Sequence, residues 1–88
     1  MPEREVKILN KLGIHARPAA EIVKTAGKFK SNITIVRDDL KINAKSIMGV
    51  MMLAAEHGAM IILRAIGDDA EAALDALAAV IANKFGES

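Results

Sequence analysis

The chain has 88 residues, enough for one small domain with a single core. Its net charge is only +1 and only two residues are aromatic, which excludes a strongly basic nucleic-acid binder and a protein that stacks bases on aromatic rings. The absence of cysteine excludes disulfides and thiolate metal sites, and no apolar run is long enough to span a membrane.

The first half of the chain alternates between strand and helix patterns. Residues 5–9 alternate as a strand, and turn-forming residues follow them. Pro18 then opens a segment with apolar residues at helical spacing, which predicts an amphipathic helix that ends near Gly27. The expected buried stripe of this helix consists of Ala19, Ile22, Val23, Ala26 and Phe29, and Thr25 lies off it.

A hairpin is expected next. Residues 33–37 are β-branched and alternating, which predicts a strand, and residues 40–43 form a shorter alternating segment. The Asp38-Asp39 pair between them predicts the turn.

The second half predicts two more helices around a strand. Residues 47–55 are apolar nearly all round and favour a helix with Ser46 as its N-cap and Gly58 at its close. Residues 60–66 predict a buried strand. Asp68 and Glu71 have the spacing of a capping box for a last helix. Its apolar face carries Leu74, Leu77, Ile81 and Phe85, and Gly86 is the residue expected just past its end.

The order of the predicted elements indicates the fold class. Strand, helix, strand, strand, helix, strand, helix is typical of an α+β domain in which helices cover one face of a four-stranded sheet. We expect one such domain over residues 1–88. The charge is uneven along it: residues 1–45 have a net charge of +5 and residues 46–88 of −4. Two solvated faces of opposite sign would explain this, as would a basic face that attracts an acidic partner.

The residues around His15 predict an anion-binding site. His15 precedes a helix that Pro18 helps to place, so its ring lies beside free backbone N–H groups and the positive end of the helix dipole. The dipole favours a neutral, nucleophilic ring, and the N–H groups of Ala16 and Arg17 can receive an anion joined to it. The Arg17 guanidinium also suits phosphate. This pattern fits a histidine that carries a phosphoryl group; the alternative is a capping or surface histidine beside a surface arginine.

Other kinds of site find less support. His57 is the only other histidine, no third metal ligand accompanies the pair, and we expect neither a metal nor a bound cofactor. His57 itself is expected to be a surface residue at a helix end. A hydrolytic triad lacks its usual nucleophile motif.

Two segments resemble one known family. Residues 11–19, Lys-Leu-Gly-Ile-His-Ala-Arg-Pro-Ala, closely resemble the active-centre motif of HPr, the histidine-containing phosphocarriers of the bacterial phosphotransferase system. Residues 45–51, Lys-Ser-Ile-Met-Gly-Val-Met, resemble the second motif of that family, and the similarity covers essentially the whole chain. The family fold is an open-faced β-sandwich of three helices on a four-stranded antiparallel sheet. Leu12 and Ala16 stand where some relatives have polar residues, so the resemblance does not define the resting geometry of the His15 ring.

The resemblance implies a function and partners. His15 would accept a phosphoryl group on Nδ1 from phosphorylated Enzyme I and pass it to an Enzyme IIA, with Arg17 stabilising the group. The chain would be a monomeric carrier rather than an independent enzyme. Its charge, its few aromatic residues and its short apolar runs already predict no nucleic-acid binding and no membrane insertion. Its first five residues are not followed by the apolar stretch of a signal peptide, which predicts a cytoplasmic protein. A nitrogen-branch regulatory protein of the same family is the alternative.

The second motif implies regulation and docking. Ser46 would be phosphorylated by an HPr kinase/phosphorylase, and a transcriptional regulator would be a further partner. The helix behind Ser46 is too short to bury every side, so an exposed Met-rich contact surface is plausible beside core packing. By resemblance, the docking face around His15 and Arg17 would include Ile47, Met48, Met51, Lys24 and Lys28.

Overall fold

The computed structural model describes residues 2–87 and contains the expected elements in the expected order. They are β1 (Glu3–Lys7), α1 (Ala16–Ala26), β2 (Asn32–Arg37), β3 (Leu40–Asn43), α2 (Ile47–Met52), β4 (Met60–Ile66) and α3 (Ala70–Ala82), followed by a 3-10 helix, η1 (Lys84–Gly86). The predicted βαββαβα order is thereby confirmed.

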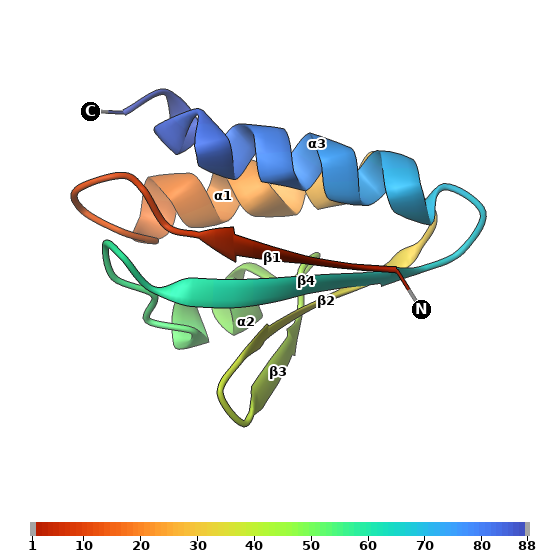
Figure 1. The fold of residues 1–88 in the computed structure, drawn as a ribbon, viewed down its shortest axis with the longest axis horizontal. Coiled ribbons are helices and arrows are strands. Elements are labelled where there is room, and N and C mark those ends of the chain that lie inside the picture. The colour runs from red at the N-terminus through yellow and green to blue at the C-terminus, as the bar shows by residue number, and fades with distance from the viewer. Residues whose placement is uncertain (1, 88) are drawn as a thin grey trace.

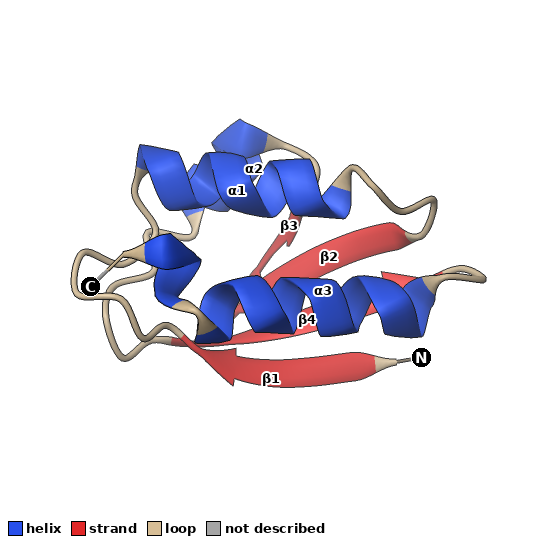
Figure 2. Cartoon of the chain, turned by 90° about the horizontal axis from the view of Figure 1, so that it is seen from above, coloured by secondary structure: helices blue, strands red, loops and turns tan. Residues whose placement is uncertain are grey.

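The four strands form one antiparallel sheet in the order β1-β4-β2-β3. Helices α1 and α3 lie side by side over one face of the sheet, and α2 lies beside α1 near β3 (Figures 1 and 2). The opposite face is open, so the predicted α+β open-faced sandwich is confirmed. The β1–α1 connection and the C-terminal segment lie at one end of the molecule, and the α1–β2 and β4–α3 connections lie at the other (Figure 1).

The core lies between the sheet and the helices. Its largest fully buried side chains are Ile8, Ile22, Ile35, Ile61, Leu63, Leu74, Leu77, Ile81 and Val50. Burial alternates along β4, where Met60 and Ile66 are exposed. The prediction of a buried strand therefore holds for Ile61, Leu63 and Ala65 but not for the other side of the strand, because one face of the sheet carries no helices. Strand β1 also ends earlier than predicted, and the Ile8 N–H donates to the Ala59 carbonyl in a loop (2.9 Å).

Helix α1 begins two residues before Pro18, and Pro18 lies buried in its first turn. The predicted stripe is confirmed at Ala19, Ile22 and Ala26. Thr25 is buried as well, contrary to the prediction, whereas Phe29 lies beyond the helix and is only partly buried. The buried surface is wider than the apolar stripe because α2 and α3 both pack against this helix.

Helix α2 is shorter than its apolar sequence predicts. Leu53 is its C-cap, and Ala54 has a positive φ of 47°, which no helix can continue. Gly58 therefore does not close the helix, and His57 lies in an exposed turn rather than at a helix end.

The predicted capping box before α3 is wrong. The N-cap is Asp69 rather than Asp68, and its carboxylate accepts hydrogen bonds from Lys30 N (2.8 Å), Ser31 N (3.0 Å) and the Ser31 hydroxyl instead of capping its own helix. At the other end, α3 stops at Ala82. Phe85 is buried as predicted but has a φ of 56° within η1. Gly86 is the last residue of that short helix, so the prediction that it directly follows α3 is wrong.

Candidate functional site

His15 is the N-cap of helix α1, with extended backbone and no hydrogen bond from its side chain to the helix. A tight turn presents it: Gly13 N donates to Asn10 O (3.1 Å), and the buried Asn10 side chain donates back to Gly13 O (2.7 Å). Gly13 has a φ of 69°, which favours glycine, and a Cβ there would lie 2.5 Å from Ala55 O. The turn before His15 and helix α1 after it thus fix the position of this residue.

The imidazole of His15 pairs with a carboxylate near the C-terminus. Its Nε2 lies 2.8 Å from Glu87 Oε2, and the other oxygen of Glu87 accepts a hydrogen bond from Asn10 Nδ2 at 2.9 Å. The Glu87 side chain is only 12% exposed, whereas that of His15 is 38% exposed. A proton on Nε2 facing the carboxylate leaves the Nδ1 lone pair of a neutral ring free for attack. The negative charge of this carboxylate counteracts the positive end of the helix dipole. The expectation of a neutral ring considered the dipole only, because Glu87 was not predicted at this site.

Arg17 provides the cation at this site. It is the second residue of α1, its side chain is 67% exposed, and its Nη1 lies 3.8 Å from Glu87 Oε2. The N–H groups of Ala16 and Arg17 belong to the first helical turn, where no carbonyl of the helix can reach them. Beside them is a hollow of about 390 Å³ lined by Lys11, Leu12, Arg17 and Glu87. An anion joined to His15 would meet two backbone donors and one guanidinium.

Two residues of this site, Asn10 and Glu87, were not predicted from the sequence. Asn10 was identified only as part of a turn, and Glu87 lies 72 residues from the histidine that it contacts. A fully buried asparagine and a largely covered carboxylate are recognisable only when the fold brings them together.

Ser46 is the N-cap of α2, as predicted: its hydroxyl accepts a hydrogen bond from Gly49 N at 3.1 Å. The helix behind it exposes Ile47, Met48, Met51 and Met52, which line an apolar hollow of about 370 Å³. Met48 is the most exposed of them, at 75%. Helix α2 packs against α1, so this apolar surface adjoins the helix that His15 caps.

Lys24 and Lys28 are exposed but distant from the histidine. Lys24 lies in the last turn of α1 and Lys28 just beyond the helix. Nine residues separate Lys24 from His15, about 14 Å along the helix axis at 1.5 Å per residue. The two lysines can therefore form only the far rim of a docking face.

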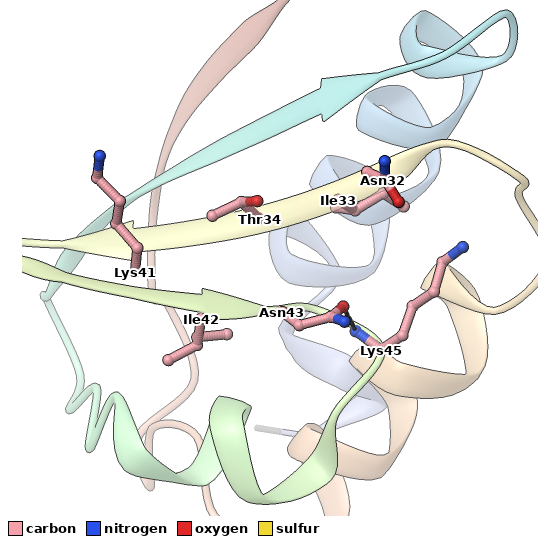
Figure 3. Close-up of a pocket in the computed structure, with 7 residues that line it drawn as sticks. All are labelled: Asn32, Ile33, Thr34, Lys41, Ile42, Asn43 and Lys45. Atoms are coloured by element: carbon pink, nitrogen blue, oxygen red, sulfur yellow. Dashed lines mark hydrogen bonds between the residues drawn. The ribbon is translucent and has the colours of Figure 1, made fainter.

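A hollow of about 450 Å³, larger than the two beside His15 and α2, lies elsewhere, between β2 and β3 (Figure 3). Its lining consists of Asn32, Ile33, Thr34, Lys41, Ile42, Asn43 and Lys45, none of them a predicted site residue. Lys45 Nζ donates to Phe29 O (2.7 Å) and Asn43 Oδ1 accepts from Lys45 N (2.8 Å), so two of its polar side chains already have partners within the chain. Among residues 2–87 no three His, Cys, Asp or Glu side chains are grouped to hold a metal ion, and no helix there is long and apolar enough to cross a bilayer.

An α+β domain that presents a half-exposed histidine at a helix N-terminus, beside an arginine, has the architecture of a histidine phosphocarrier. A family model described as "PTS HPr component phosphorylation site" matches residues 2–83. The phosphocarrier protein HPr of Cupriavidus necator is 49% identical and covers 99% of this chain and 98% of its own length. The phosphocarrier protein NPr of Shewanella violacea is 45% identical and covers 98% of this chain and 94% of its own length.

A solved structure also matches. The crystal structure of an HPr from Thermoanaerobacter tengcongensis superposes with a TM-score of 0.96 at 51% identity, covering 100% of this chain and 99% of that one. The chain belongs to the HPr family and is a phosphocarrier of the phosphotransferase system.

Proposed function

We propose that His15 Nδ1 accepts the phosphoryl group from phosphorylated Enzyme I and transfers it to an Enzyme IIA. The contact between His15 Nε2 and Glu87 carries this proposal, because it leaves Nδ1 as the nitrogen available for attack. The ring is accessible to a second protein because more than a third of its side-chain surface is exposed.

The chemistry follows from the groups around the ring. The Nδ1 lone pair attacks phosphorus in line, the N–P bond forms and the bond to the donor's leaving nitrogen breaks. The ring keeps its proton on Nε2 and becomes positively charged, which the Glu87 carboxylate at 2.8 Å stabilises. The Arg17 guanidinium and the N–H groups of Ala16 and Arg17 offset the negative charge of the phosphoryl oxygens. In the second transfer a nucleophile of the acceptor attacks phosphorus, the His15 Nδ1–P bond breaks, and Nδ1 regains its lone pair.

The docking surface in this proposal is the apolar patch of α2, formed by Ile47, Met48, Met51 and Met52, together with the exposed Arg17. Flexible methionine side chains suit contact with several partners in turn. Lys24 and Lys28 form the basic rim, which would attract acidic partner surfaces.

Ser46 is the proposed regulatory site. A phosphate there would lie at the start of α2, beside Ile47 and Met48, and would place about two negative charges next to the docking surface. An HPr kinase/phosphorylase is the expected modifying enzyme, and a transcriptional regulator a further partner of the modified form. We place the monomeric chain in the cytoplasm.

The sugar branch of the phosphotransferase system is the primary assignment, and the nitrogen branch is the second candidate because a protein named NPr is 45% identical. Purified sugar-branch and nitrogen-branch forms of Enzyme I should distinguish them. We expect the higher kcat/KM with the sugar-branch enzyme; a clear preference for the other would reverse the assignment.

Intact mass after incubation with Enzyme I and phosphoenolpyruvate tests the carrier role of His15. We expect one phosphoryl group per chain, labile in acid and stable in base. His15→Ala should abolish the added mass, whereas His57→Ala, which alters a histidine in an exposed turn, should retain it. A phosphoryl group that persists in His15→Ala would contradict the assignment.

A further inference from the structure

Arg37, the last residue of β2, binds the segment that follows helix α2. Its Nη1 donates to the carbonyl oxygens of Leu53 (3.0 Å) and Ala54 (2.9 Å), and its Nη2 lies 2.6 Å from Glu56 Oε1. Hydrogen bonds from its own backbone N–H and from Arg37 hold the pKa of Glu56 below its ordinary value, so this carboxylate is charged at neutral pH. One guanidinium therefore binds three groups within residues 53–56.

This segment has a backbone that its sequence alone does not favour. Leu53 ends the helix, and Ala54 adopts a left-handed φ of 47°, which is sterically disfavoured for alanine. Carbonyls at a helix C-terminus also lack partners within the helix. Arg37 supplies donors to the two carbonyls at this bend, and its planar, forked guanidinium is suited to binding several acceptors at once.

The other side of the same segment supports the loop that carries His15. Ile14 N donates to Ala55 O at 2.8 Å, and Gly13 packs so closely that a Cβ would lie 2.5 Å from Ala55 O and 2.9 Å from Glu56 Cα. Residues 53–56 thus contact Arg37 on one side and the two residues before His15 on the other.

We propose that Arg37 is a positioning residue for phosphoryl transfer. It holds residues 53–56 in place, and this segment in turn keeps Gly13 and Ile14, and therefore His15, in the reactive position. This inference rests on the proposed carrier role of His15. Displacement of the reacting histidine would slow the chemical step, because transfer depends on the alignment of the attacking nitrogen. Binding of Enzyme I should be affected less, because the apolar patch precedes the segment that Arg37 binds.

The test compares Arg37→Gln with a matched control, Arg64→Gln. Arg64 is also a strand arginine paired with a glutamate, Glu3 at 2.5 Å, and its side chain is 28% exposed against 24% for Arg37. For Enzyme I-dependent phosphorylation of Arg37→Gln we expect kcat to fall about three- to tenfold, well short of the ~100-fold cost of a 1 Å misplacement, with KM within about twofold. Arg64→Gln should retain both constants.

Two further measurements separate positioning from general stability. Amide hydrogen exchange should accelerate at Ile14 in Arg37→Gln while the amides of β4 stay protected. Arg37→Lys retains the charge but not the fork, and it should recover part of kcat and of the Ile14 protection.

The outcomes are distinct. If Arg37→Gln matches Arg64→Gln in kcat and in Ile14 exchange, the inference is wrong, although the wild-type chain still accepts phosphate. If the wild-type chain takes up no phosphate, the proposed function itself fails. Should Arg37→Gln not fold, Arg37→Lys decides: wild-type kcat and Ile14 protection in that variant would overturn the inference.

Discussion

The two ring nitrogens of His15 have different environments, and Glu87 makes the difference. Its carboxylate faces Nε2 at 2.8 Å, while Asn10 donates to its second oxygen at 2.9 Å. Because Asn10 is fully buried, the carboxylate is held in place before any phosphoryl group arrives. In the proposed transfer, the ring would present Nδ1 without first having to reorient, which would lower the entropic cost of the step.

Arg17 is expected to exchange partners during the reaction. In the structure its Nη1 lies 3.8 Å from Glu87, a distance that indicates a weak surface ion pair. A phosphoryl group on His15 offers a charge-assisted hydrogen bond worth about 1.5–3 kcal/mol. Arg17→Ala should therefore reduce kcat/KM for transfer by roughly tenfold or more, with the melting temperature nearly unchanged. Phosphorylation kinetics with Enzyme I and with an Enzyme IIA measure this.

Arg4→Ala is a suitable control for Arg17→Ala. Arg4 also pairs with acidic side chains, Glu71 and Asp75 on α3, but it contributes nothing to the proposed site. Its loss should leave transfer unchanged. Equal transfer rates in both variants would mean that Arg17 is only a solvated surface charge.

At the scale of elements, patterns local in sequence predict structure well. The β2–β3 hairpin and the stripe of α1 were predictable because each depends on neighbouring residues. The bounds of β3 and β4 also agree with the prediction, but two helix ends do not. Helix α2 stops where Arg37 binds Leu53 and Ala54, and the Asp69 carboxylate accepts from Lys30 and Ser31 instead of capping α3. The site divides in the same way, since His15 and Arg17 belong to one motif whereas Glu87 reaches it from the other end of the chain.

Helix α2 combines a structural cap with the proposed docking surface, and Ser46→Asp should separate the two. An aspartate is a good N-cap and interacts favourably with the helix dipole, so the melting temperature should remain near that of the wild type. The added charge beside Ile47 and Met48 should raise the apparent KM for Enzyme I. This effect should weaken as salt rises, because repulsion between exposed charges is screened beyond about 8–10 Å at physiological ionic strength.

Ser46→Ala provides the opposite change. It removes the hydroxyl that accepts from Gly49 N and should cost about 1 kcal/mol of stability while KM stays at the wild-type value. If Ser46→Asp transfers as well as the wild type at low salt, Ser46 is a helix cap only and the regulatory proposal loses its physical basis.

At the scale of the whole molecule, we expect stability and transfer to depend on opposite ends of the fold. The β1–α1 connection, which contains Asn10 and His15, and the C-terminal segment, which contains Glu87, lie at one end of the fold (Figure 1). Asp69 joins the α1–β2 and β4–α3 connections at the other end. A Cβ on Gly67 would lie 2.5 Å from Ser31 Oγ, so these two connections pack tightly. A defect there should reduce stability without altering the geometry of the reacting histidine.

Asp69→Asn tests this separation and carries a signature in pH. The hydrogen bond from the Ser31 hydroxyl, and after it that from Lys30 N, hold the pKa of Asp69 below its ordinary value. A carboxyl whose pKa is lower in the folded state stabilises the fold at pH above its unfolded pKa of about 3.9, and this stabilisation is lost as the pH falls through the folded pKa. Asp69→Asn should therefore melt several degrees lower at pH 7, and the difference from the wild type should shrink in acid.

Asp68→Asn changes the exposed neighbour that the sequence indicated as the cap, and it should melt like the wild type at every pH. Below its melting range Asp69→Asn should accept phosphate at the wild-type rate. A pH-independent loss of stability, or slower transfer in the fully folded variant, would show that the two ends of the fold are not independent.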